Sequence, residues 1–455
     1  MIDCLRRVAD PVIDRTLLNK HPLFIAILVL VAVHLVIIPF VVEYDVNYWA
    51  YVTRNMRAGY GLYELDGYYY TPVWGYVISL VNLITTYMVP GLGLMSVRVF
   101  DALGVETVSS TYFTTATTVS LAFDYIIKIP LIISDIVMAY LVYWLVMDYT
   151  DSRRKAMVAF FLTGTCPLII GTTCITGMPD TFSATFLLLS IVLVRKEKPF
   201  LAGMTFAASV LTKFFPVFLL PLFIVWVVFR KNRRDGAFDL LFAFIGAAVM
   251  AAVILLPAVI EGNLMECFAF ISDRASTGGD SSLMDVIVSK SRVLFYGALL
   301  LVSVALAYRM RTCPEGGIDN RMMSLSFLMM VLCMLYPPAP QYIVVMIPFL
   351  VYFGVTTDSR YYHSWIILAV SAFLFIPATN AQVLLTLAEW TPLLSVDAVM
   401  GVFDFYQNTL FGITYMDLQY YIGGALQYIG IVSVLLLYLE GSGYLRFGRG
   451  VPETA

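Results

Sequence analysis

Apolar segments about as long as a bilayer is thick recur along this chain, and they constrain its fold more than any other feature. The first runs from Pro22 to Val42 without an Asp, Glu, Lys or Arg residue. About 20 apolar residues are enough to cross a hydrocarbon core of about 30 Å. Only 13% of the 455 residues are charged and 60% are hydrophobic, whereas about 25% charged residues is usual in soluble proteins. The sequence therefore excludes an ordinary soluble enzyme, and membrane spans rather than domains have to be counted.

The remaining composition excludes two classes of site. The net charge is −3, and no cluster of basic and aromatic residues suggests a groove for nucleic acid, so no nucleic-acid partner is expected. Six cysteines lie far apart without metal-ligand spacing, and three histidines form no zinc motif. We therefore expect no disulfide framework, no metal site and no cofactor.

Basic residues set the expected topology, because Lys and Arg concentrate in cytoplasmic loops. Clusters that include the N-terminal four hold 20 of the 28 basic residues, and an even number of spans must separate neighbouring clusters. The expected spans are 22–42, 124–147, 156–175, 180–194, 199–213, 215–229, 238–259, 289–308, 322–337, 341–356, 364–379 and 420–439. This predicts an all-α polytopic membrane protein with about 12 transmembrane helices in one integral membrane domain (1–455). Both termini would then be cytoplasmic.

The segment 72–89 is apolar but does not fit this count, so we expect it to lie in the outer leaflet as an interfacial helix. Residues 43–123 then form one large extracytoplasmic loop rich in tyrosine and tryptophan, which suits either membrane anchoring or a binding site. Further extracytoplasmic loops are expected at 260–288 and 380–419.

Ionisable residues in or beside spans are hypotheses for functional sites because they are costly there. Asp45 follows the first span, and partial desolvation would raise its pKa and suit it as a general base. Glu43 could add like-charge repulsion. The alternative is an ordinary exposed acid at a helix end.

Lys213 ends an apolar span, and Pro216 disfavours helical geometry at the residue before it, so a broken helix beside a cation is expected. A lysine there suits a lipid phosphate, or it simply reaches toward the headgroups. Lys128 lies four residues after Asp124, so the two can neutralise each other. Asp135 lies deeper, where a hydrogen bond between helices is the simpler interpretation.

Two further places complete the candidate set. Arg292 ends a polar loop that is either a functional lid or a floppy connection. Gln341 and Tyr342 follow a proline-rich turn and re-enter the membrane together.

Several short motifs in order make the chain resemble the GT-C superfamily of membrane glycosyltransferases, which use polyprenyl-phosphate sugars. The nearest resemblance is to the catalytic subunits of GPI mannosyltransferase I and their prokaryotic relatives. The series covers nearly the whole chain: Tyr44-Asp45-Val46-Asn47-Tyr48, Gly61-Leu62-Tyr63, Tyr70-Thr71-Pro72, Ser134-Asp135, Gly177-Met178-Pro179-Asp180, Leu211-Thr212-Lys213 and Gln341-Tyr342. It departs from the family where Asn47 and Met178 replace an expected Asp and Asn.

The resemblance implies that Asp45 is the catalytic base and that the first outer loop contains in-plane helices. It also implies a polyprenyl-phosphate or dolichyl-phosphate sugar donor and inversion at the anomeric carbon. The expected enzyme moves a sugar, mannose in our interpretation, to a lipid-linked or glycan acceptor on the extracytoplasmic face. Donor phosphate would contact Lys213, Lys128 and Arg292. Acceptor or sugar would contact Glu43, Asn47, Tyr70, Asp180, Gln341 and Tyr342.

Two other classes of protein stay open at this point. A multispan transporter or lipid flippase usually shows internal repeats with paired broken helices, and none is evident here. A non-catalytic membrane subunit is disfavoured by the ionisable residues near one face. Membrane lipids are the surrounding partners, and a small membrane partner subunit is compatible with the sequence.

Overall fold

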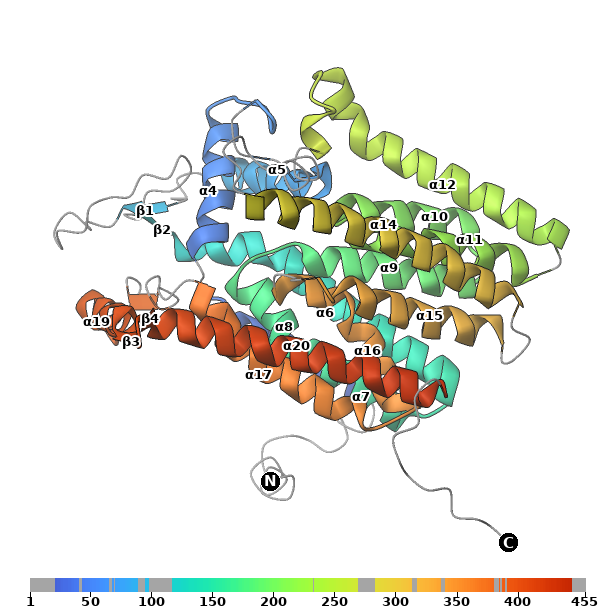
Figure 1. Ribbon diagram of the computed structural model, residues 1–455. Coiled ribbons are helices and arrows are strands. Elements are labelled where there is room, and N and C mark those ends of the chain that lie inside the picture. The colour runs from blue at the N-terminus through green and yellow to red at the C-terminus, as the bar shows by residue number, and fades with distance from the viewer. Residues whose placement is uncertain are drawn as a thin grey trace, which may run out of the picture.

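The computed structural model describes residues 21–40, 43–64, 68, 70–88, 95–97, 117–231, 233–268, 283–312, 317–336, 340–379, 384, 387–388 and 391–443. In these parts the chain is a bundle of long helices that run roughly along one direction (Figure 1). Five described helical segments are long and apolar enough to cross a membrane: Leu121–Thr150, Arg153–Ile175, Arg234–Ile260, Lys290–Thr312 and Tyr415–Gly441. These segments identify an integral membrane protein.

The first half of the bundle begins with α3 (Pro22–Ile37), α4 (Glu43–Arg57) and α5 (Pro72–Tyr87). It continues with α6 (Leu121–Thr150), α7 (Arg153–Gly164), α8 (Pro167–Ile170), the π-helix η2 (Gly171–Ile175), α9 (Asp180–Arg195), α10 (Pro199–Thr212), the 3-10 helix η3 (Phe215–Leu219) and α11 (Leu220–Phe229).

The second half contains α12 (Arg233–Ile260), the 3-10 helix η4 (Glu266–Phe268), α14 (Leu283–Thr312), α15 (Ile318–Cys333) and the 3-10 helix η5 (Pro340–Val345). It ends with α16 (Ile347–Thr356), α17 (Tyr361–Thr379), α19 (Val396–Gln407) and α20 (Tyr415–Gly441).

Each of the twelve expected spans coincides with a helical segment, but the bounds differ. The first helix ends at Ile37, five residues before the expected end. The helix expected from 289 begins at Leu283, so Lys290 and Arg292 lie on α14 and not in a loop. The last helix begins at Tyr415 rather than 420. Several of these segments are shorter than a full span, so twelve membrane crossings stay a prediction.

One end of the bundle is covered by elements of a different kind. Figure 1 shows α4 lying crosswise to the long helices, with α5 beside it. Two short antiparallel hairpins lie at the same end, formed by β1 (Met95–Val97) with β2 (Thr117–Val119) and by β3 (Thr409–Leu410) with β4 (Ile413–Thr414). Apart from these short strands the described elements are helices, in agreement with the expected all-α class.

The end of the bundle that α4 and α5 cover has its own apolar core. Buried side chains of α4, α5 and the first turns of α6 pack together, including Trp49, Trp74 and Phe123. A separate and larger cluster fills the space between α6, α9, α11, α15 and α16. The elements before α6 are therefore fixed to the bundle by burial, which holds α4 in place.

Helices α6, α9 and α10 are joined by hydroxyl groups. The Ser134 and Thr185 hydroxyls lie 2.8 Å apart between α6 and α9. The Ser209 hydroxyl of α10 donates to the Ser183 carbonyl of α9 at 2.7 Å. In apolar surroundings such bonds stabilise helix pairs by about 0.6 kcal/mol each on average. They fix the position of α9, which begins at the candidate site, and of α10, which ends there.

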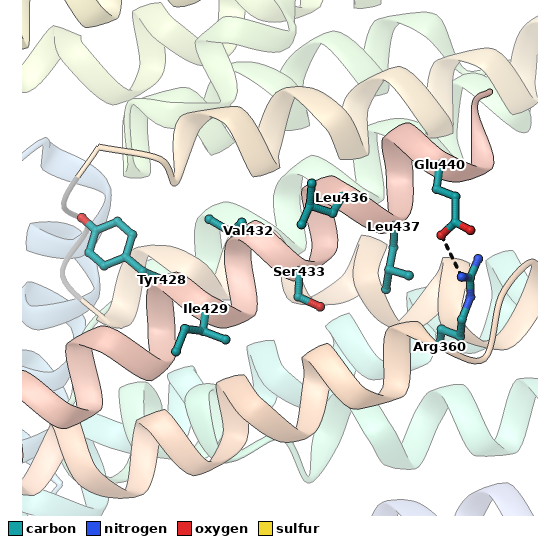
Figure 2. Close-up of a pocket in the computed structure, with 8 residues that line it drawn as sticks. All are labelled: Arg360, Tyr428, Ile429, Val432, Ser433, Leu436, Leu437 and Glu440. Carbon is teal, nitrogen blue, oxygen red and sulfur yellow. Dashed lines mark hydrogen bonds and ion pairs between the residues drawn. The ribbon is translucent and has the colours of Figure 1, made fainter. Parts of the chain in front are cut away.

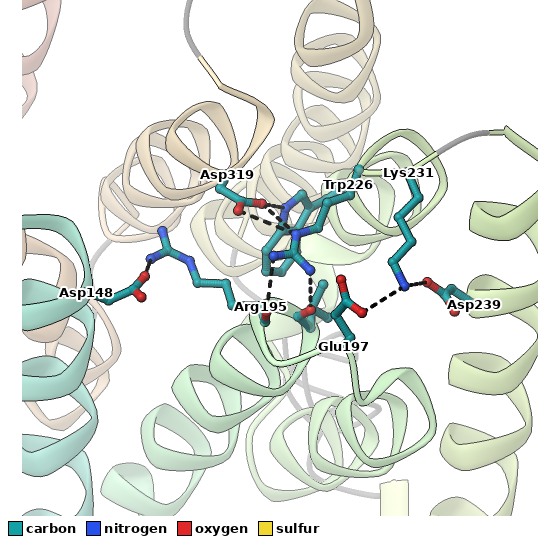
Figure 3. A network of polar contacts seen from close by, with 9 residues as sticks. Asp148, Arg195, Glu197, Trp226, Lys231, Asp239 and Asp319 are labelled. Carbon is teal, nitrogen blue, oxygen red and sulfur yellow. Dashed lines mark hydrogen bonds and ion pairs between the residues drawn. The ribbon is translucent and has the colours of Figure 1, made fainter.

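The opposite end of the bundle carries a network of ion pairs, shown in Figure 3. Arg230 contacts Asp319 at 3.1 Å, Arg195 contacts Asp148 at 2.9 Å, and Lys231 contacts Asp239 at 3.2 Å. Basic residues from two of the clusters, Arg195 with Arg230 and Lys231, thus lie at the same end of the bundle.

Candidate active site

Three charged residues from three separate elements meet at the end of the bundle that α4 covers. Asp45 comes from the first turn of α4, Asp180 begins α9, and Lys213 directly follows α10. The Lys213 ammonium lies 3.3 Å from the Asp180 carboxylate, and both side chains are almost fully buried. Both charges act on Asp45. We define Asp45, Asp180 and Lys213 as the charged cluster.

The position of Lys213 follows from the local sequence. Helix α10 ends at Thr212, and Lys213 has an extended backbone (φ −146°, ψ 139°). Pro216 then lies in the 3-10 helix η3, and α11 follows. The broken helix expected beside Lys213 is therefore confirmed. After this break the Lys213 side chain contacts Asp180 at the start of α9.

Asp180 is placed by an irregular turn. The π-helix η2 is followed by Gly177, whose φ of +66° is a conformation that side chains with a Cβ rarely adopt. A Cβ at Gly177 would also lie 3.0 Å from Val46 of α4. Asp180 then occupies the first turn of α9, where the partial positive charge of the helix N-terminus favours a carboxylate.

Two tyrosine rings face the lysine. The Lys213 ammonium lies 5.2 Å from the ring centre of Tyr70 and 5.3 Å from that of Tyr342. Such cation–π contacts contribute about 2 kcal/mol when desolvated. Tyr70 also packs against Trp49 of α4, with ring centres 5.6 Å apart. The structure thus brings Asp45, Tyr70, Asp180, Lys213 and Tyr342 of the expected set together.

The Asp45 carboxyl is suited to proton transfer near neutral pH. Burial raises its pKa to about 7, in the direction expected from the sequence. The Lys213 charge lowers the pKa, and the Asp180 charge raises it. A general base works best when its pKa lies near the working pH. Asp180 is thus a second carboxylate that acts on Asp45.

The other expected residues are placed differently. Lys128 is fully buried, pairs with Asp124 at 2.5 Å and lies 3.4 Å from the Ile38 carbonyl oxygen. A phosphate could reach it only by displacing Asp124. The Arg292 guanidinium lies over the Tyr336 ring at 5.8 Å.

Among the remaining acceptor-side candidates, Asn47 is buried in α4 and Gln341 is half-buried at the start of η5. The backbone of Glu43 begins α4, and its side chain is outside the described part of the chain. No group of three or more His, Cys, Asp or Glu that could hold a metal ion occurs in the described ranges.

The hydrogen bond between helices that was expected for Asp135 is confirmed, and its partner His34 was not predicted. His34 in α3 and Asp135 in α6 lie 3.2 Å apart, and neither side chain is exposed. The available signal was an ionisable residue in the middle of each of two apolar segments.

A groove elsewhere on the molecule is unrelated to this cluster. Figure 2 shows it along α20, where Ile429, Val432 and Leu436 lie between Tyr428 and the Arg360–Glu440 ion pair. It contains none of the expected site residues.

The chain was compared with known proteins. Residues 121–338, just under half of the chain, match the model of glycosyltransferase family 87. This region contains Lys128, Asp180 and Lys213, and it begins after Asp45. No curated protein matches the sequence. Among solved structures, the chain is similar to ArnT from Cupriavidus metallidurans bound to undecaprenyl phosphate, with 14% identity, a TM-score of 0.45, and coverage of 92% of this chain and 77% of that one.

Proposed function

We propose that this chain is a membrane glycosyltransferase that moves a sugar, mannose in the first instance, from a polyprenyl-phosphate donor to a hydroxyl of a lipid-linked or glycan acceptor. The observation that carries the proposal is the charged cluster, where a carboxyl group with a pKa of about 7 lies beside a buried lysine. The match of residues 121–338 to glycosyltransferase family 87 supports the reaction class.

The proposed reaction is a single displacement. Asp45 accepts the proton of the acceptor hydroxyl while that oxygen forms a bond to C1 of the sugar. The bond between C1 and the phosphate oxygen breaks, and the electron pair leaves with polyprenyl phosphate. Attack opposite to the leaving group inverts C1. Asp45 afterwards releases the proton to water.

Lys213 is the residue we propose for the leaving phosphate. Its positive charge would stabilise the negative charge that develops as the C1–O bond breaks. In the structure this charge is paired with Asp180, so phosphate has to share or replace that contact. The rings of Tyr70 and Tyr342 flank the ammonium and would limit access of water to it.

The remaining assignments have less structural support. Arg292 on α14 is a candidate for guiding donor phosphate, because the ring system around it continues through Tyr296 and Phe218 to η3. Lys128, held by Asp124, fits a role in shaping the site better than a role in binding phosphate. Asn47, Gln341 and Glu43 stay predictions for the acceptor or sugar.

The proposal includes an orientation. The ion-pair network of Figure 3 would face the cytoplasm with both termini, and the charged cluster would lie at the extracytoplasmic end. Helices α4 and α5 would then lie near the membrane plane. The resemblance to GPI mannosyltransferase I catalytic subunits and any need for a partner subunit belong to the same hypothesis.

The test is a donor and acceptor screen with purified protein in nanodiscs. Wild type should transfer mannose from polyprenyl-phosphate mannose to a hydroxyl acceptor, and Asp45→Asn should lose at least about a hundredfold in rate, as expected for a general base. Asp148→Asn, at the opposite end of the bundle, is the matched control and should keep wild-type activity. An Asp45→Asn enzyme with unchanged activity would exclude Asp45 as the base. Transport of the lipid without consumption of the sugar would favour a flippase instead.

A further inference from the structure

His34 and Asp135 form a buried ionisable pair that the proposed reaction does not use. The His34 Nε2 atom lies 3.2 Å from Asp135 Oδ2, and His34 Nδ1 lies 2.8 Å from the Leu30 carbonyl oxygen. A carbonyl only accepts, so Nδ1 carries a hydrogen and donates it. The contact between Nε2 and the carboxylate then needs one more proton, which the two side chains share. The imidazole ring is therefore fixed on both sides.

The pair connects several elements that are distant in sequence. His34 comes from α3 and Asp135 from α6. The Thr173 hydroxyl of η2 and the Thr181 hydroxyl of α9 lie near the Asp135 carboxylate without a hydrogen bond to it. The two threonines bracket the turn that leads into α9. This turn packs on both helices of the pair, because Cys174 of η2 shares an apolar cluster with Ile38 at the end of α3 and Ile132 of α6. The pair therefore fixes the two helices against which the turn rests.

The bracketed turn touches the charged cluster from two directions. The Gly177 carbonyl accepts a 2.9 Å hydrogen bond from the Trp49 indole, and Trp49 lies one turn after Asp45 on α4. Asp180, at the other side of the turn, forms the ion pair with Lys213. A displacement of the turn would therefore move Asp45 and Asp180 relative to each other.

Burying an ionisable pair between helices has a large desolvation cost. Apolar side chains of similar volume often stabilise a protein as well as a buried ion pair does, and ionisable residues inside membrane segments are generally functional. The η2 segment is also a π-helix, and such irregular turns are frequent at functional sites.

We propose that His34 and Asp135 are positioning residues of the active site. They hold the segment from Thr173 to Thr181 in place, and this segment sets the distance between Asp45 and Asp180. The inference rests on the proposed function for its kinetic test only.

The kinetic test is a double-mutant cycle with Asp180→Asn. Asp135→Leu should lower kcat about tenfold or more with the donor KM within about twofold, and in the Asp180→Asn background its effect should shrink to less than about threefold. Asp135→Asn keeps the side-chain shape and a polar contact to His34 Nε2, so it should restore most of the rate. Asp319→Leu, at the opposite end of the bundle, is the matched control. Its effect on kcat should be the same in the wild-type and the Asp180→Asn backgrounds.

A milder variant keeps the test decisive where Asp135→Leu fails to fold. Thr181→Val preserves the side-chain shape and removes only the hydroxyl that lies near Asp135, so it should show the same dependence on Asp180. Equal losses in both backgrounds for these variants, or an Asp135→Asn enzyme as slow as Asp135→Leu, would overturn the proposal.

A second measurement does not depend on activity. Hydrogen exchange should accelerate in peptides covering 171–182 in Asp135→Leu and Thr181→Val, and peptides around Trp226 and Arg230 should keep their wild-type rates. Uniform acceleration, or none, would contradict the positioning role. An inactive wild type with the local exchange response would refute the transferase and leave the positioning of this turn standing.

Discussion

The charged cluster makes one prediction whose sign is unusually specific: two substitutions should move the pH profile of the enzyme in opposite directions. The base must be deprotonated to work, so kcat/KM of the wild type should rise with pH and reach half its maximum near the Asp45 pKa of about 7. Lys213 lowers that pKa and Asp180 raises it. Lys213→Gln should therefore shift the profile to higher pH, and Asp180→Asn should shift it to lower pH.

The size of the shift follows from the placement of Asp45. A nearby full charge moves a carboxyl pKa by about 1–3 units, and we expect about one unit for each substitution, since each removes one of two opposing charges. One unit corresponds to about a tenfold change in the ratio of base to acid. At pH 7 the deprotonated fraction would fall from about a half to about a tenth in Lys213→Gln. It would rise to about nine tenths in Asp180→Asn.

The assay is kcat/KM for labelled donor between about pH 5 and 9, in nanodiscs at fixed ionic strength. The readout is the pH at half-maximal activity, because the maximum itself also reflects phosphate binding by Lys213. Asp148→Asn should leave that pH unchanged. If the pH at half-maximal activity shifts in the same direction in both variants, or shifts in neither variant, the titrating group is not Asp45.

Three further predictions concern stability and binding. Asp45→Asn should raise the thermal unfolding temperature at pH 8 although it abolishes transfer. The folded pKa of about 7 exceeds the reference value of 3.8, so ionised Asp45 destabilises the folded protein, and this cost grows between those two pH values and is complete above pH 7. Scanning fluorimetry should show the gain shrinking toward pH 4. Gly203→Val should prevent the packing of α10 on α12, because a Cβ there would lie 1.8 Å from the Ala243 carbonyl oxygen; size-exclusion chromatography should show loss of monodisperse protein. Tyr342→Leu should raise the donor KM about tenfold, roughly the value of a partly desolvated cation–π contact, and Tyr342→Phe should keep wild-type kinetics.

Local sequence patterns predicted the features that depend on neighbouring residues. The break at Lys213 follows from Pro216 three residues later. The Asp124–Lys128 pair follows from helical spacing of four residues. The expected spans coincide with helices because apolar runs of that length have few alternatives in lipid.

Contacts between distant segments could not be predicted in this way. The sequence places Glu43 beside Asp45, but it gives no sign that the carboxylate of Asp180, far along the chain, lies close enough to raise the Asp45 pKa. His34 and Asp135 likewise pair only because α3 packs on α6. Which face of each helix meets which neighbour depends on packing around η2 and Gly177, and the π-helical turn there has no clear local signature.

The hydroxyl pairs between α6 and α9 also determine how deep the charged cluster lies. Ser134 is level with Thr185. From Thr185 to Asp180 the chain rises about 7 Å, whereas from Ser134 to Leu121 at the start of α6 it rises about 20 Å, at about 1.5 Å per residue. Asp180 and Lys213 therefore lie about 12 Å below the outer end of α6. A donor anchored by its isoprenoid chain would meet Lys213 without leaving the bilayer, and the acceptor hydroxyl would have to descend to it.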